Sequence, residues 1–208
     1  KIDRGAWKRE EVFRHYHEDA PCFYSMTVSL DVTRLRAAGL RLYPAMLHAL
    51  STIVNRHEEF RTAIVGGAVG VYDVLFPCYT VFHPETETFS NLLTAYRPYY
   101  AGFLAAYEEE LRLYEHLEGF APKPGTPENI FTVSMLPWAS FEGFHLELPR
   151  GNDYLLPIFT MGRMHARDGR TLLPLALQVH HAVCDGFHAC RLVHEAQELL
   201  DAPEAWGG

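Results

Sequence analysis

The region from Pro157 to Leu200 constrains the fold more than any other part of the chain. Apolar, strand-forming residues lie on both sides of a short turn, in the order PIFTMGRMH, ARDG and RTLLPLALQVHH. A helix is expected to follow from about Phe187 to Leu200. Strands that are joined by a turn and followed by a helix predict a domain in which helices pack on a sheet.

Helical and strand-like patterns alternate along the rest of the chain. Apolar residues at helical spacing predict helices over 7–17, 43–60 and 99–119, the last of them closed by Gly119. Strand composition predicts strands over 22–32, 68–75, 78–83, 128–136 and 141–148, with a loop over 121–129. The sequence has no internal repeat or low-complexity tract, so residues 1–208 are expected to form a single domain. The expected fold is α/β, a two-layer sandwich of a mixed β-sheet with helices.

Composition excludes several classes of partner. With 208 residues, of which 48% are hydrophobic, the chain is able to bury a sizeable core. The formal net charge of -8 argues against a nucleic-acid partner, because phosphate binding needs a basic surface. No run approaches the roughly 18 apolar residues of a membrane span, and the first twenty residues lack the apolar core of a signal peptide. We therefore expect no membrane partner.

The cysteines favour a reducing compartment. Cys22, Cys78, Cys184 and Cys190 are spread through apolar contexts, in a chain large enough to need no disulfide staples. Reduced, mostly buried thiols are expected. The predicted location is the cytoplasm.

The segment from Gln178 to Glu195 is the densest in reactive side chains, with four histidines, two cysteines and an Asp-Gly pair. His180 and His181 are adjacent in a predicted strand, so their side chains point to opposite faces and cannot chelate one ion together. Asp185 lies where the strand gives way to the helix, which favours an N-cap role. Gly186 would ease that turn.

Zinc binding by this segment is an alternative that the spacing makes weak. Cys184 and His188 are four residues apart, as are Cys190 and His194. However, Cys184 precedes the predicted helix, and the set lacks the paired spacings of structural zinc motifs. Proton chemistry needs only one imidazole, neutral near pH 7 and held in one tautomer. We therefore expect acid–base chemistry and no metal.

The histidine pair also carries a family resemblance. HHAVCDG, residues 180–186, resembles the HHxxxDG motif of coenzyme A-dependent acyltransferases, and QVHHAVCDGFH resembles the active-site signature of the chloramphenicol acetyltransferase family. Further blocks similar to that family follow the same order along the chain: WKREEVF, LYPAMLHAL, PCYTVFHPETETFS, TPENIFTVSMLPWASF and PIFTMGRM. Condensation domains and carnitine acyltransferases are much longer, and dihydrolipoyl acyltransferases share the motif without these blocks. The resemblance spans nearly the whole chain and implies a fold of the coenzyme A-dependent acyltransferase type.

The resemblance implies specific catalytic roles. His181 would be the general base that takes a proton from the acceptor hydroxyl as it attacks the thioester of acetyl-CoA, with no covalent acetyl-enzyme. Ser134 would donate a hydrogen bond to the oxyanion, and Thr160 would assist through a bound water. Asp185 would pair with Arg9 and shape the active-site loop. His180 is expected to be structural.

The resemblance also implies two binding regions. The acceptor would lie among apolar and aromatic side chains, which here are Tyr16, Cys22, Phe89, Phe144, Leu146, Tyr154 and Ile158. Coenzyme A would run near Tyr43, Trp138 and Arg163, and Arg163 is able to meet a phosphate. Met164 stands where some relatives carry a tyrosine, so the adenine contact of this chain would differ.

Acetyl transfer to the primary hydroxyl of chloramphenicol is the activity that the resemblance implies, and it would inactivate the antibiotic. The family resemblance further implies a homotrimer whose sites lie at subunit interfaces, with His181 reaching a pocket built mainly by its neighbour. Two alternatives remain at this point: transfer to another hydroxylated small molecule, and a non-catalytic ligand-binding relative.

Overall fold

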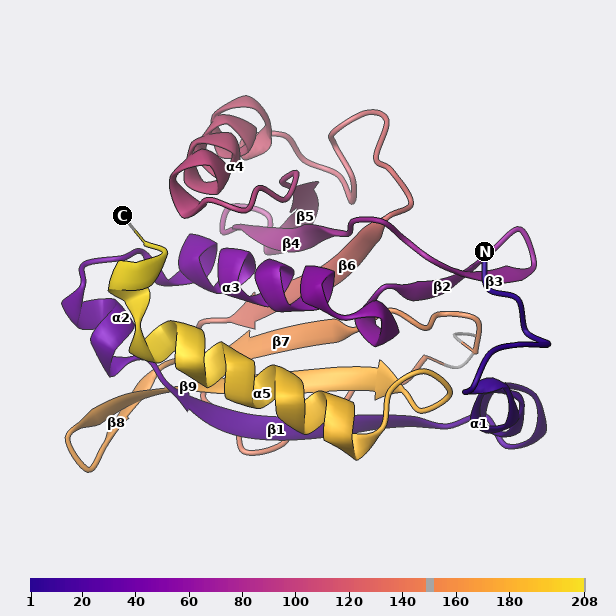
Figure 1. The fold of residues 1–208 in the computed structure, drawn as a ribbon. Helices are drawn as coiled ribbons and strands as arrows, with labels where there is room; N and C mark the ends of the chain where they lie inside the picture. The colour runs from indigo at the N-terminus through magenta and orange to yellow at the C-terminus, as the bar shows by residue number, and fades with distance from the viewer. Residues whose placement is uncertain (149–151, 208) are drawn as a thin grey trace.

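The computed structural model describes residues 1–148 and 152–207, in which helices pack on one face of a large mixed sheet (Figure 1). The sheet runs in the order β1-β9-β7-β6-β4-β5, and β8 pairs with β9. Its strands are β1 (Phe23–Asp31), β4 (Phe76–His83), β5 (Thr88–Leu93), β6 (Ile130–Leu136), β7 (Ile158–Gly162), β8 (His165–Arg167) and β9 (Arg170–His180). β6 is parallel to both β4 and β7, whereas β1, β5 and β9 run antiparallel to their neighbours. The predicted mixed α/β sandwich is confirmed.

The helices and a small hairpin complete the structure. The remaining elements are α1 (Glu10–Arg14) with its π-helical continuation η1 (His15–Asp19), α2 (Thr33–Ala37), α3 (Leu42–Arg56), η2 (Glu58–Phe60), β2 (Thr62–Val65), β3 (Ala68–Val71), α4 (Tyr100–Tyr114), α5 (Gly186–Asp201) and η3 (Pro203–Ala205). Figure 1 shows α3 and α5 side by side across the sheet, with α4 beyond α3 near β4 and β5. In the described part of the chain, no helix has the length and apolar character needed to cross a membrane.

Strand pleating separates two kinds of side chain. Val133, Phe159 and Val179 of β6, β7 and β9 are buried on the face that the helices cover. Residues one position along each strand lie on the opposite face, where Ser134 is in register with Thr160. We call this the polar face; its members include Ser25, Thr27, Thr132, Ser134, Thr160 and Gln178. Two candidate catalytic residues, Ser134 and Thr160, therefore lie on the face opposite to the apolar core.

Several sequence predictions are confirmed. The C-terminal strands form β7, β8 and β9, and the predicted helix is α5. Asp168 and Gly169 make the turn between β8 and β9 with φ of 48° and 74°, the left-handed values that a two-residue hairpin requires. β1, β4, β6, α3 and the loop over 121–129 also lie where they were expected.

The predicted strand over 141–148 is wrong. This segment has no strand; its backbone instead bonds to side chains of the polar face. The Phe144 N–H donates to Thr27 Oγ1 at 3.3 Å, and the Leu146 N–H donates to Gln178 Oε1 at 3.0 Å. Alternating apolar residues led to the error, because they cover a sheet here instead of joining it.

Other element boundaries also differ from prediction. α4 ends at Tyr114, well before Gly119, although Gly119 does adopt a positive φ of 108°. The strands β2 and β5 and the helix α2 were not predicted. Each is only four to six residues long, so little periodic pattern is available in any of them.

Candidate active site

His181 lies directly after β9, at the start of the loop 181–185 that leads into α5. Its backbone N–H donates to the carbonyl of Cys22 at 2.9 Å. The imidazole stacks on the ring of Tyr16, with centroids 4.0 Å apart, and meets the edge of Tyr24. The side chain is 28% exposed, so two aromatic rings hold it while solvent or a ligand is still able to reach it.

Arg9 binds this loop through an ion pair with Asp185 and hydrogen bonds to two backbone carbonyls. Its Nη1 and Nη2 donate to the two carboxylate oxygens of Asp185 at 2.8 and 2.6 Å. Nε also donates to the carbonyl of Ala182 at 2.7 Å, and Nη2 donates to the carbonyl of His181 at 3.0 Å. The Arg9 guanidinium holds the pKa of the Asp185 carboxyl below its usual range. The pairing that the family resemblance implied is present, and it joins residues 176 positions apart.

Asp185 does not hydrogen-bond His181 as the third member of a triad would. The His181 Nδ1 lies 3.4 Å from Asp185 Oδ1. That Nδ1 atom is buried and has no hydrogen-bond partner among the described residues. The carboxylate is instead committed to Arg9, which fits an architectural role better than a proton relay.

Asp185 is the N-cap residue of α5, as its position in the sequence predicted. Its backbone N–H donates to Nδ1 of His188 at 2.9 Å. The His188 side chain is 22% exposed, and burial lowers its pKa. The loop is thus fixed at its second end by the first turn of the helix that follows.

His180, the neighbour of His181, is fully buried. Its Nδ1 accepts the Ala182 N–H at 3.1 Å, so in the neutral ring the proton is on Nε2, which lies 3.3 Å from Asn152 Oδ1. Asn152 in turn donates to the backbone carbonyl of His17 at 2.7 Å. Burial lowers the pKa of His180 to about 4, which keeps the ring neutral at physiological pH.

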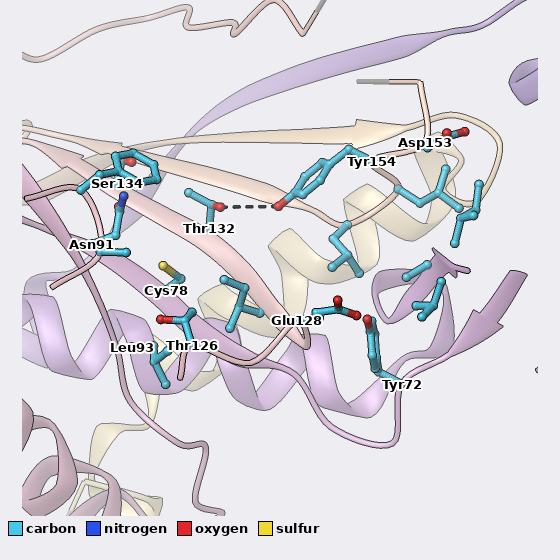
Figure 2. A pocket seen from close by; sticks show the side chains of 18 of the residues that line it. Tyr72, Cys78, Asn91, Leu93, Thr126, Glu128, Thr132, Ser134, Asp153 and Tyr154 are labelled. Atoms are coloured by element: carbon cyan, nitrogen blue, oxygen red, sulfur yellow. Dashed lines mark hydrogen bonds between the residues drawn. The ribbon is translucent and has the colours of Figure 1, made fainter. Parts of the chain in front are cut away.

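Ser134 lies in a different place, a cavity of about 760 Å³ beside β4, β5 and β6. In Figure 2, Ser134, Thr132 and Cys78 line it from neighbouring strands, and the hydroxyl of Tyr154 approaches Thr132 at 3.4 Å. Thr160 is in register with Ser134 on β7 and is almost fully buried. This cavity combines an apolar wall with a few hydroxyl groups, which is typical of a small-molecule site.

Within one chain, His181 and Ser134 are far apart. Ser134 is in register with Thr160, which is in register with Ala176 of β9. Two strand spacings of about 4.8 Å, combined with about five residues along β9, put the two Cα atoms roughly 19 Å apart. No single reacting group spans that distance.

The predicted acceptor residues divide in the same way. Tyr16 and Cys22 contact His181, whereas Phe89 and Tyr154 line the cavity of Ser134. The segment with Phe144 and Leu146 lies over the polar face near Gln178, and Ile158 is in register with Gln178 and Thr132 in that sheet. The described residues of one chain do not gather this set into a single pocket.

Two of the predicted coenzyme A residues lie together, and one does not. Trp138 is 57% exposed, and Arg163, also exposed, donates its backbone N–H to the carbonyl of Ala139 at 2.8 Å. Both lie just beyond the adjacent ends of β6 and β7. Tyr43 instead packs under the sheet, where its hydroxyl donates to the carbonyls of Thr80 and Val133 at 3.3 and 3.5 Å. Met164 packs against the core.

The cysteines and histidines do not form a metal centre in the part of the chain that the structure describes, where no cluster of three or more possible ligands occurs. All four cysteines are free thiols. Burial raises the pKa of Cys78 to about 11 and that of Cys184 to about 12, so neither is a reactive thiolate near pH 7.

Sequence reasoning missed three residues that hold this site. His188 occupies the N3 position of α5, where a capping residue accepts the N-cap N–H, so the Asp-Gly at the helix start was a usable signal. Tyr24 contacts His181 only because β1 pairs with β9. Asn152 has no sequence signal, since its partners His17 and His180 are distant in the chain.

Comparison with known proteins identifies close relatives. A family described as "Chloramphenicol acetyltransferase" matches residues 1–197. The chloramphenicol acetyltransferase of Clostridium perfringens is 53% identical over 203 residues, covering 97% of this chain and 98% of that protein. That of Clostridioides difficile is 54% identical over 201 residues, covering 96% and 95%. A solved chloramphenicol acetyltransferase structure, 24% identical, covers 96% of this chain and 98% of its own with a TM-score of 0.79, which shows a shared fold.

Proposed function

Because the chain belongs to the chloramphenicol acetyltransferase family, we propose that it transfers the acetyl group of acetyl-CoA to the primary hydroxyl of chloramphenicol. The observation that carries this proposal is the clamped loop 181–185, in which Arg9 and Asp185 fix His181 beside an accessible space. As a single domain acting in the cytoplasm, the protein would inactivate the antibiotic and confer resistance.

His181 acts as the general base through Nε2. Its Nδ1 is buried and cannot reach a substrate, so Nε2 takes the proton from the acceptor hydroxyl as that oxygen attacks the thioester carbonyl. For Nε2 to accept that proton, Nδ1 must carry the proton of the neutral ring. No metal and no acetyl-enzyme are needed.

Ser134 stabilises the charge that develops on the former carbonyl oxygen. A hydroxyl donor held on a strand is a preorganised oxyanion donor, because the rigid sheet fixes its position before reaction. Thr160, its neighbour in register, assists through a bound water. The sulfur of coenzyme A leaves as the tetrahedral intermediate collapses, and the proton on His181 is available to it.

The complete site forms between copies of the chain. His181 and Ser134 lie roughly 19 Å apart in one chain, so they meet at one substrate only if a neighbouring copy supplies one of them. A homotrimer with a site at each interface satisfies this requirement, since each copy then gives a His181 to one site and a Ser134 to another. Ser25, Thr27, Thr132 and Ser134 of the polar face are only partly buried within one chain, so a neighbouring copy is able to contact them.

The acetyl acceptor lies between two half-sites, one around His181 of one copy and the other around Ser134 of its neighbour. Tyr16 and Cys22 line it from the copy that supplies His181, and Phe89, Phe144, Leu146, Tyr154 and Ile158 complete its walls. Coenzyme A enters beside Trp138 and Arg163, which are both exposed, with Tyr43 supporting the sheet beneath.

Release of free coenzyme A thiol from acetyl-CoA, with and without chloramphenicol, tests the proposal. Chloramphenicol-dependent release that disappears in His181→Ala supports it, because general-base loss costs about 10² to 10⁴-fold. Release that depends on another hydroxylated molecule instead would favour a different acceptor. No release with any hydroxylated acceptor, despite ligand binding, would favour a non-catalytic relative.

A further inference from the structure

We propose that His188 is a positioning residue for this reaction, and that it must be a neutral hydrogen-bond acceptor to perform that role. The inference rests on the proposed acetyl transfer. His188 contacts neither half-site directly; it acts through Asp185.

The contact is defined by one hydrogen bond with a fixed direction. The Asp185 backbone N–H donates to Nδ1 of His188 at 2.9 Å, so Nδ1 must present its lone pair. A protonated ring has no lone pair and loses this bond. Burial lowers the pKa of the ring, which favours its neutral form. Of the nearby charges, those of Glu59 and Asp185 raise this pKa and those of Arg9 and Arg191 lower it.

The bond anchors the catalytic loop at its second end. At the first end, the His181 N–H is held by the carbonyl of Cys22, and Arg9 binds the carbonyls of His181 and Ala182. The Asp185 amide is then the last fixed peptide before α5. Without an acceptor at residue 188, this part-buried N–H would lose its partner, and the carboxylate beside it would lose its fixed position.

The hydrogen-bond acceptor at residue 188 must also be uncharged, because it lies close to the Asp185 carboxylate. The usual residue at the N3 position of a capping box is Glu or Gln. Here Nδ1 of His188 is 3.7 Å from Asp185 Oδ2, the oxygen that accepts from Arg9 Nη1 at 2.8 Å. A glutamate would bring a second carboxylate against Asp185 and compete for Arg9. A neutral imidazole caps the helix without weakening that ion pair.

Three substitutions separate positioning from helix capping. His188→Gln keeps a neutral hydrogen-bond acceptor. His188→Glu keeps a hydrogen-bond acceptor but adds a negative charge, and His188→Ala removes the hydrogen-bond acceptor. The control is His194→Gln, an exposed histidine on the same helix outside the loop contacts. For each protein, kcat and both KM values are measured with acetyl-CoA and chloramphenicol, and the midpoint of thermal unfolding is recorded.

We expect His188→Gln and His194→Gln to keep kcat within about threefold of the wild type. His188→Ala and His188→Glu should lose roughly 10-fold to 100-fold in kcat with nearly unchanged KM values, because a misplaced base slows chemistry more than binding. His188→Glu should still fold but unfold at a lower midpoint than His188→Gln, because the added carboxylate weakens the Arg9–Asp185 pair. Equal kcat for Gln and Glu, or full kcat in Ala, would overturn the inference. Absence of chloramphenicol-dependent turnover in the wild type would instead contradict the proposed function.

Discussion

The imidazole of His181 lies flat on the phenol ring of Tyr16, with an interplanar angle of 5° and centroids 4.0 Å apart. The stack fixes the plane in which the ring nitrogens lie. The ring of Tyr24 packs edge-on against the same imidazole, with ring centroids 5.4 Å apart. Because His181 has no hydrogen bond at Nδ1 among the described residues, these aromatic contacts and the backbone of its loop are what hold its orientation.

Tyr16→Leu should lower kcat by about 2-fold to 12-fold, since a stacked aromatic pair contributes roughly 0.5 to 1.5 kcal/mol. Tyr16→Phe, the matched control, keeps the ring and should stay within about twofold of the wild type. Steady-state kinetics at saturating acetyl-CoA measures both. Equal losses in the two variants would assign the effect to the hydroxyl group and contradict the stacking role.

The Arg9–Asp185 pair should stabilise the fold by roughly 1 to 2 kcal/mol. This is less than the 3 to 5 kcal/mol typical of breaking a fully buried pair, because the Asp185 side chain is 40% exposed and partly screened. Urea unfolding of Arg9→Gln, Asp185→Asn and the double variant measures the coupling. Additive effects of the two single substitutions would show that the pair contributes nothing beyond its members.

The pH dependence of that pair follows from the direction of the Asp185 pKa shift. Arg9 lowers the folded-state pKa below its usual value of 3.8, so the stabilisation is fully present above pH 3.8 and is lost as pH falls through the lower folded value. The difference in unfolding free energy between wild type and Asp185→Asn should be constant from pH 7 to about 4.5. A gap that closes near pH 6 would contradict this assignment.

His180 should make stability depend on pH in a higher range. Its folded pKa of about 4 is below the usual 6.5, so the unfolded chain binds a proton first and stability falls as pH drops from 6.5 toward 4. His180→Asn keeps an acceptor near the Ala182 N–H without titrating. Between pH 7.5 and 5, the stability advantage of the wild type over this variant should shrink by about 2 kcal/mol. Urea unfolding at one fixed protein concentration measures it, and a constant gap would refute the neutral buried state.

The parts of the fold that were predictable are those with long, regular patterns. β9 and α5 follow from continuous apolar composition, and the Asp168-Gly169 turn follows from the backbone conformation that only a few residues adopt readily. The segment over 141–148 has the alternation of a strand but lies across the sheet, because Gln178 and Thr27 offer it side-chain partners. Local pattern cannot distinguish a strand from a segment that covers one.

Contacts in the site between residues that are distant in the sequence were predictable only from the family resemblance. Arg9 and Asp185 are at opposite ends of the chain, and no local rule joins them. The N-cap role of Asp185 was predictable locally, since it depends on neighbouring residues alone. The contacts of Asn152 with His17 and His180 depend on three separate segments, which the sequence pattern does not relate.

Ser134→Ala should lower kcat by about 10² to 10³-fold while both KM values stay nearly unchanged, because an oxyanion donor matters most in the transition state. Initial-rate plots distinguish this role from a serine nucleophile. Intersecting lines support direct attack by the acceptor. Parallel lines, or an acetyl group on Ser134 found by mass spectrometry, would show a covalent intermediate and contradict the account.

The central claim, that one site takes His181 from one copy and Ser134 from another, is tested most directly by mixing two inactive variants. His181→Ala and Ser134→Ala chains are refolded together at equal concentration, and chloramphenicol-dependent release of coenzyme A thiol is compared with that of each variant refolded alone. Random assembly into trimers leaves about one quarter of all sites with both groups intact, so the mixture should recover about one quarter of the wild-type activity. Activity no greater than the mean of the two separate variants would show that the site lies within one chain and would contradict the account.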